Sequence, residues 1–170
     1  MLFAPLDRTH LRASFDCGVT ELNRFLQENA LQFVKKGLCA VHILADETSI
    51  VGYYALSASS IIAANLPESV AKKYPDRLPI PCWLLGKLAV DRRYQGQQFG
   101  KLLLMDALNH IVEMSKNAGG YCVIVDAKDG KAKDFYLKYG FQPFPNSELR
   151  LYLLLASIQE IADCGGRNRV

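Results

Sequence analysis

The stretch from residue 84 to residue 104 constrains the fold of this chain more than any other part of the sequence. An apolar run, 84–90, leads through a short polar loop with two glycines, Gly96 and Gly100, into a segment whose apolar residues recur at helical spacing. The first backbone amides of a helix have no partner within the helix, and the helix dipole makes that end positive. Because glycines let a ligand approach the backbone closely, the stretch predicts an anion site that suits the diphosphate of a nucleotide-like cofactor.

The spacing of the glycines distinguishes between the known kinds of phosphate-binding loop. A Walker A loop has four residues between its glycines and then Lys followed by Ser or Thr, whereas here three residues separate Gly96 from Gly100, and Leu102 follows Lys101. The dinucleotide fingerprint needs three glycines near the start of a βαβ unit, and this loop has two and lies late in the chain. The spacing therefore favours neither a P-loop ATPase nor a Rossmann fold.

The loop resembles the Gln/Arg-x-x-Gly-x-Gly/Ala element of the GNAT family of N-acetyltransferases, whose backbone amides hold the pyrophosphate of acetyl-CoA. Gln95 takes the first position and Gly100 the last, while Gln98 stands where the family has its first glycine. Gly96 is expected to supply part of the flexibility that this substitution removes. A second block, 134–141, resembles the family's late A-x-x-F-Y-x-x-x-G-F element at the expected distance after the loop.

Three further blocks of sequence resemble one particular class of proteins within this family. Residues 15–23, 51–56 and 79–90 look like the corresponding parts of the acetyltransferase toxins of bacterial type II toxin–antitoxin pairs. Together with the loop and the late block they span nearly the whole chain. The resemblance implies the GNAT acyl-CoA N-acyltransferase fold and an acetyl-CoA-dependent enzyme.

Hydrophobic periodicity independently predicts an α/β protein with the element order α, β, β, α, β, α, β, α, β, which fits a mixed sheet flanked by helices. One GNAT domain is expected over residues 1–162, and the Gly- and Arg-rich tail, 163–170, is expected to be flexible. The first expected elements are a helix from Leu22 to Val34 with Thr20 as N-cap and Gly37 as its stop, a hairpin of strands 41–45 and 50–56, and a short helix 66–74. An extended loop through Pro75, Pro79 and Pro81 follows, and then a strand 84–90 and a helix through Ile111 that Gly119 and Gly120 break. The last expected elements are a strand 121–126, a helix 131–139 and a strand 149–155.

Composition places the chain among globular proteins, since 50% of its 170 residues are hydrophobic and 22% are charged. Five widely spaced cysteines and three histidines without a shared ligand spacing favour reduced thiols in the cytoplasm and no metal site. The first ten residues lack the pattern of a signal peptide. The uncharged stretch 48–67 is long enough for a membrane span, but its serines, asparagine and paired tyrosines favour buried strands that lead into a loop, so no membrane partner is expected.

The resemblance also assigns residues to the reaction. Tyr136 matches the family's proton donor, and Tyr139, one turn further on, is the rival candidate. A phenol with a pKa near 10 is a poor base at neutral pH but a suitable donor to a departing thiolate. The residues expected to bind acetyl-CoA are Leu88, Ala89 and Val90 through their backbone, the loop residues Gln95, Gly96, Gln97, Gln98, Phe99, Gly100 and Lys101, and Phe135.

The acceptor is expected to be an α-amine. Residues 82–90 contain no carboxylate, whereas histone-type lysine acetyltransferases place a glutamate base on this strand. Neutralising a lysine near pKa 10.4 at neutral pH costs about 4 kcal/mol, and neutralising an α-amino group near 7.7–8.0 costs only about 1 kcal/mol. With the toxin resemblance, this predicts acetylation of aminoacyl-tRNA, which would block translation. The cations expected to flank the acceptor cleft and hold RNA phosphates are Lys35, Lys36, Lys72, Lys73, Arg77, Arg92 and Arg93.

The expected partners are an antitoxin of the ribbon-helix-helix type, operator DNA through that antitoxin, and a second copy of the chain in a homodimer. Two alternatives stay open. The modest net charge of +3 also suits an enzyme that acetylates a small amine, an antibiotic or a protein N-terminus. A non-catalytic CoA-binding subunit, in which Gln98 marks lost turnover, would serve only to dock a DNA-binding antitoxin.

Overall fold

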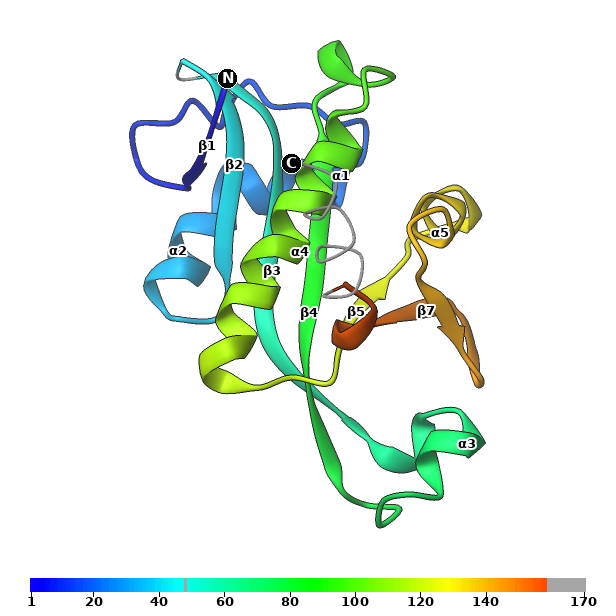
Figure 1. Ribbon diagram of the computed structural model, residues 1–170. Coiled ribbons are helices and arrows are strands. Elements are labelled where there is room, and N and C mark those ends of the chain that lie inside the picture. Colours follow the sequence, from blue (N-terminus) through cyan, green and yellow to red (C-terminus); the bar gives the residue numbers. More distant parts are fainter. Residues whose placement is uncertain (48, 159–170) are drawn as a thin grey trace, which may run out of the picture. The chain divides into compact units, whose positions relative to one another are not determined.

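The computed structural model describes residues 1–47 and 49–158, so the expected tail, 163–170, lies outside the described residues. The strands are β1 (Leu2–Pro5), β2 (Ala40–Asp46), β3 (Ser49–Ile62), β4 (Pro79–Val90), β5 (Cys122–Asp126), β6 (Gln142–Phe144) and β7 (Ser147–Leu154). They form a mixed sheet in the order β1-β2-β3-β4-β5-β7-β6, in which β4 and β5 run parallel (Figure 1). The α/β class with a mixed sheet is confirmed.

The helical segments are α1 (Thr20–Arg24), the π-helical turn η1 (Phe25–Asn29), α2 (Ala30–Lys35), the 3-10 turn η2 (Ala63–Asn65), α3 (Glu68–Ala71), the 3-10 turn η3 (Arg92–Tyr94), α4 (Phe99–Ala118) and α5 (Gly130–Leu137). The described residues pack as two compact units. The first unit holds residues 1–57 and 85–107, and the second holds residues 58–84 and 108–158.

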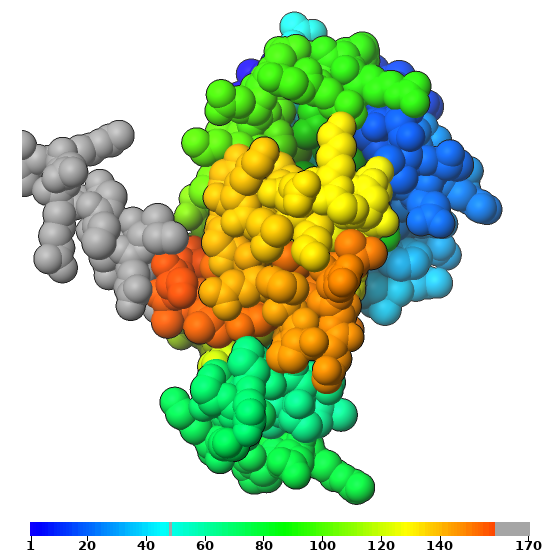
Figure 2. Space-filling view, turned by 90° about the vertical axis from the view of Figure 1, so that its right-hand side faces the viewer, coloured from blue at the N-terminus to red at the C-terminus, as the bar shows by residue number. Residues whose placement is uncertain are grey.

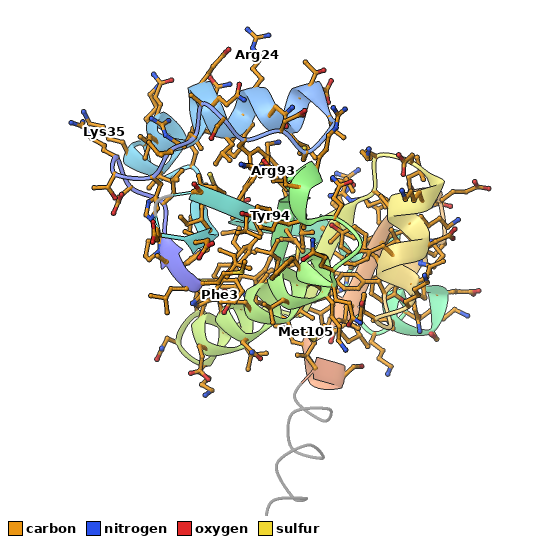
Figure 3. The ribbon with its side chains drawn as sticks, turned by 90° about the horizontal axis from the view of Figure 1, so that it is seen from above. Phe3, Arg24, Lys35, Arg93, Tyr94 and Met105 are labelled. Carbon is orange, nitrogen blue, oxygen red and sulfur yellow. The ribbon has the colours of Figure 1, made fainter. Side chains whose placement is uncertain are left out.

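In the first unit, α1 and α2 cover one face of β2 and β3, and the start of α4 covers the other (Figures 1 and 3). Phe25, Leu26 and Ala30 of the helical face pack with Ile43 and Tyr53 of the strands. The π-helical turn adds one residue between Phe25 and Ala30, whose amide donates to the Phe25 carbonyl. This extra residue keeps both side chains on the buried face.

The first helix begins at Thr20, so the prediction that Thr20 is its N-cap is wrong. Val19 occupies the cap position and offers no side-chain acceptor. The segment before the helix is ordered instead by Asn23, whose side chain accepts from the Cys17 amide at 2.8 Å. At the other end Gly37, with φ +68°, stops the helix as expected.

Close approach of backbones explains a glycine in β3. A Cβ atom on Gly52 would lie 2.8 Å from the carbonyl oxygen of Ala89 in β4 and 2.6 Å from Leu103 of α4. Leu103, Leu104 and Ala107 are buried, as the helical periodicity predicts. Any side chain at position 52 would therefore displace the strand that leads into the loop after β4.

The second unit has a core of its own. Ile61 and Ile80, from the paired ends of the segment 58–84, pack with Cys122 of β5, Phe144 of β6 and Tyr152 of β7. Figure 2 shows residues 60–80 standing beside the β6–β7 hairpin. The end of α4 is fixed by Trp83, whose indole donates to Ser115 Oγ at 2.9 Å and to the Gly119 carbonyl at 3.3 Å.

Several strands differ from the sequence prediction, and β3 also runs on to Ile62. β4 begins at Pro79, so the loop expected around Pro79 and Pro81 is partly strand. Proline is tolerated at the first residue of a strand, and the Pro81 carbonyl still accepts from the Tyr121 amide at 2.8 Å. The short strands β1 and β6 were not predicted. No helix among the described residues has the length and apolarity that a membrane crossing needs.

Candidate functional site

The loop after β4 has the backbone shape of an anion site. The chain leaves β4 at Val90, passes through η3 and turns over residues 95–98 before α4 begins at Phe99. The Leu102 amide is the first in α4 to reach a carbonyl, that of Gln98, at 3.2 Å. The amides of residues 99–101 have no partner within the helix, and they lie at its positive end.

Gln98 adopts the conformation for which glycine is usually needed. Its φ is +65°, in the left-handed region, and Gly96 has φ +79°. A non-glycine residue pays roughly 1–2 kcal/mol for this conformation. The Gln98 side chain is exposed, so it meets no steric obstacle. The loop therefore keeps its glycine-like backbone although a glutamine stands at this position.

A buried carboxylate anchors the start of the loop. Asp91 is only 2% exposed and is the one buried charged side chain among the described residues. Its oxygens accept from Arg93 Nε at 2.8 Å, from the Arg93 amide at 3.0 Å and from the Asp16 amide at 3.1 Å. Burial raises the pKa of Asp91, but these hydrogen bonds and the Arg93 charge outweigh it, so the pKa lies below its usual value.

The segment 16–18 braces the loop from the other side. The Gln95 side chain donates to the Cys17 carbonyl at 3.0 Å and to the Val90 carbonyl at 2.9 Å. Arg92 donates through its amide to the Asp16 carbonyl at 2.8 Å, and its guanidinium pairs with the Asp16 carboxylate at 3.0 Å. Sequence reasoning missed these roles of Asp16 and Asp91. The one available signal was a polar residue placed directly at the carboxyl end of an apolar strand.

Tyr136 lies on α5, in the second unit. The helix is capped by Asp129, whose side chain accepts from the Ala132 amide at 2.8 Å. The Tyr136 ring packs at 5.2 Å from Phe135 and 5.4 Å from Phe141, and the residue is 8% exposed. Within the described part of the chain, no hydrogen bond is found for its hydroxyl. Burial raises the pKa of this phenol above the usual value of 10, so the hydroxyl keeps its proton at neutral pH.

Tyr139, the rival candidate, is less buried than Tyr136. Its ring lies 5.1 Å from Phe135, in an edge-on contact. Phe135 therefore packs against both tyrosines and is itself partly exposed.

The predicted RNA-binding cations fall on several elements. In the first unit, Lys35 points away from the sheet at the outer end of α2, and Arg93 lies apart from it near α1 (Figure 3). Arg92 and Arg93 are already paired with carboxylates, those of Asp16 and Asp91. In the second unit, Lys72 pairs with Glu68 at 2.6 Å on α3, and the other predicted cations there, Lys73 and Arg77, follow it in the chain.

Among the described residues, no three His, Cys, Asp or Glu side chains come together in a group that could hold a metal ion.

Comparison with known proteins gives a family match and close relatives. The sequence model of the acetyltransferase (GNAT) domain family matches residues 37–143. A probable toxin TacT from Sinorhizobium fredii is 31% identical over 170 residues, which cover 94% of each chain. A tRNA-acetylating toxin from Mycobacterium tuberculosis is 34% identical over 142 residues, which cover 84% of each chain.

Solved structures resemble the whole fold. AtaT complexed with acetyl-methionyl-tRNAfMet is 32% identical with a TM-score of 0.86, covering 95% of this chain and 98% of that one. A mutant AtaT toxin bound to the C-terminus of the antitoxin AtaR and acetyl-CoA is 28% identical with a TM-score of 0.81, covering 94% and 96%. The AtaT–AtaR complex bound to DNA is 28% identical with a TM-score of 0.78, covering 95% and 99%. The matched residues include both the loop residues 95–101 and Tyr136, and the chain belongs to the GNAT family of acetyl-CoA-dependent N-acetyltransferases.

Proposed function

We propose that this chain acetylates the α-amino group of aminoacyl-tRNA and thereby blocks translation, as a toxin that a cognate antitoxin neutralises. The observation that carries the proposal is the loop at the start of α4, whose backbone is shaped for a diphosphate. The whole-chain similarity to a tRNA-acetylating toxin and to AtaT bound to acetyl-methionyl-tRNAfMet supports the substrate.

The loop fits acetyl-CoA through its amides. The amides of residues 96–101 bind the pyrophosphate, and Gly96 and Gln98, both with positive φ, give the loop the left-handed turns that such a site uses. The Gln95 amide donates to the Arg92 carbonyl at 3.4 Å instead. The backbone of Leu88, Ala89 and Val90 takes the pantetheine arm as a neighbouring strand would. Acetyl-CoA supplies the acetyl group as an activated thioester when bound, and the chain contributes mainly positioning.

Tyr136 holds the proton that the departing thiolate needs. The raised pKa of its phenol keeps the Oη proton in place at neutral pH, and no described side chain competes for it through a hydrogen bond. Residues 82–90 of β4 carry no carboxylate to serve as a base. The acceptor is therefore an amine that is neutral in appreciable amount at pH 7, which an α-amine is and a lysine side chain is not.

The RNA is held by phosphate contacts, which position any tRNA without choosing among them. Most of this attraction comes from Lys35, Lys36, Lys73 and Arg77. Lys72 contributes less because it already pairs with Glu68 at 2.6 Å. Arg92 and Arg93 contribute less because nearby carboxylates already compensate their charges. Recognition of the amino acid and of a few acceptor-stem bases supplies the specificity.

The partners follow from the same assignment. The chain works in the cytoplasm as a homodimer and is neutralised by an antitoxin of the ribbon-helix-helix type, through which the pair binds operator DNA. The complexes of AtaT with AtaR and of that pair with DNA support an antitoxin and a DNA-bound state.

The test is transfer of label from acetyl-CoA into total tRNA, charged or deacylated, with small amines in parallel. Label in the charged tRNA alone supports the proposal. Label on deacylated tRNA contradicts the α-amine as acceptor, and efficient acetylation of free amines without any labelled tRNA favours a small-amine enzyme. Thiol release that the wild type performs and Tyr136→Phe does not perform excludes a non-catalytic subunit.

A further inference from the structure

We propose that the side chain of Gln95 is a positioning residue for acetyl-CoA: it ties the phosphate loop to the fixed segment 16–18 instead of touching the cofactor. The inference rests on the proposed function, because it concerns the same loop. The proposal gives segment 16–18 a role in cofactor binding. The sequence does not indicate this role, because the segment lies far from Gln95 along the chain.

The first argument is the geometry of the Gln95 amide group. The Nε2 atom donates two hydrogen bonds, both to backbone carbonyls: that of Cys17 at 3.0 Å and that of Val90 at 2.9 Å. A side-chain amide nitrogen has two N–H donors, so both are used. This nitrogen has no donor left for a phosphate, and the bridge closes the loop over the end of β4.

The second argument is that the acceptor side of the bridge is itself held in place. The Asp16 carboxylate accepts from the Gly18 amide at 2.9 Å and from Asn23 Nδ2 at 2.7 Å, and these bonds flank the Cys17 carbonyl. The Asp16 amide in turn donates to the buried Asp91 carboxylate at 3.1 Å. Gln95 therefore joins the loop to a segment that five hydrogen-bonding groups have already ordered: the Asp16 amide and carboxylate, the Gly18 amide, Asn23 and Asp91.

The third argument is close packing at the same place. A Cβ atom on Gly18 would lie 2.8 Å from Nε of Arg92, the residue that begins η3. Gly18 also has φ +85°, which disfavours a side chain there. The segment thus lies directly against the base of the loop, where a small displacement would move the amides of residues 96–101.

The experiment compares two glutamines of one loop. Gln97 is a matched control because the proposed pyrophosphate contact uses its backbone amide, which the substitution retains. Among the described residues its side chain bonds only to the Arg93 carbonyl, four residues earlier, at 3.3 Å. Binding of acetyl-CoA is measured by calorimetry for the wild type, Gln95→Leu and Gln97→Leu, with turnover at saturating acetyl-CoA and thermal unfolding without ligand. Gln95→Arg, which restores N–H donors on a long side chain, is the rescue variant.

Gln95→Leu is expected to raise the dissociation constant of acetyl-CoA about tenfold, whereas Gln97→Leu changes it less than about threefold. Turnover at saturation stays within about twofold of wild type, because the bridge acts on binding rather than on proton transfer. Gln95→Arg recovers most of the affinity. If Gln95→Leu is unfolded at the assay temperature, Gln95→Asn is measured in its place. Its shorter side-chain amide cannot reach both carbonyls, so the same loss of acetyl-CoA affinity is expected.

Equal affinities of wild type and Gln95→Leu overturn the positioning role and leave the proposed function standing. An equal loss of acetyl-CoA affinity in Gln95→Leu and Gln97→Leu has the same two consequences. A loss of turnover in Gln95→Leu without a loss of affinity also overturns the positioning role and leaves the proposed function standing. A wild-type protein that binds no acetyl-CoA overturns the proposed function itself, and the positioning role with it.

Discussion

The most unusual residue of the loop is Gln98, a side chain held in the left-handed region at φ +65°. Replacing it with glycine removes the steric cost of that conformation, so Gln98→Gly should raise the free energy of unfolding by about 0.5–1 kcal/mol. Denaturant unfolding measures the change. Gln97→Gly is the control, since residue 97 has no positive φ and glycine there should lower stability by about 0.5–1 kcal/mol. Parallel losses in both variants would show that Gln98 is not strained.

Removing one oxygen atom tests the proton donor. Tyr136→Phe keeps the buried ring and its contacts with Phe135 and Phe141, so folding and acetyl-CoA affinity should stay unchanged. Turnover should fall roughly 100-fold or more, as expected for the loss of a general acid. Tyr139→Phe is the control and should retain most of the activity. Equal turnover of Tyr136→Phe and wild type would leave Tyr139 or water as the donor.

The pH dependence of the rate follows from the direction of the Tyr136 shift. Burial raises the pKa of this phenol above 10, so the proton persists at higher pH than in a free tyrosine. The acceptor α-amine must be neutral, and its fraction rises through a pKa of about 7.7–8.0. Turnover at saturating substrates should therefore rise with pH through this range and show no fall up to about pH 10. A decline that begins near pH 9 would contradict a buried phenol as the donor.

At the scale of elements, the base of the loop joins two segments that are far apart in the chain. The Asp91 carboxylate accepts from Asp16 and Arg93, and its pKa is held below the usual 3.8. A carboxylate whose folded pKa is depressed stabilises the fold above its unfolded pKa, and the contribution disappears as pH falls through the folded pKa. Asp91→Asn should thus be less stable than wild type at pH 7, and the difference should shrink as the pH falls below 3.8. A difference that stays constant from pH 7 to pH 2 would assign the loss to packing instead.

Elements with a strong internal pattern could be predicted from the sequence. The β2–β3 hairpin, α4 with its break at Gly119, β5 and α5 carry their own periodicity and stop signals. β1 and β6 have only four and three residues, each with a proline, so their pairing with a neighbour creates them rather than any local propensity. The π-helical turn likewise depends on which side chains the core must receive, and a helical pattern alone does not show it.

At the scale of the whole molecule, the site residues also fall into two groups: those that a local sequence motif indicates, and those whose role depends on contacts between distant parts of the chain. The loop residues 95–101 and Tyr136 each belong to a contiguous motif, so the sequence alone nominates both for the site. The contact of Asp16 with Asp91 joins residues 75 positions apart, and no spacing in the sequence reveals such a pair. Reassigning Gln95 from ligand to brace also required the positions of the Cys17 and Val90 carbonyls. Prediction thus nominated residues for the site but did not reach the hydrogen bonds that hold the loop in place.

The central claim is that the acetyl group arrives on the α-amine of an aminoacyl-tRNA. The most direct measurement treats charged tRNA with the protein and acetyl-CoA, releases the amino acids by mild alkali and identifies them by mass spectrometry. The account predicts an amino acid acetylated on its α-nitrogen, produced by the wild type and nearly absent with Tyr136→Phe. Unmodified amino acids together with an acetyl group on a nucleotide, or acetylation confined to a side-chain amine, would contradict it.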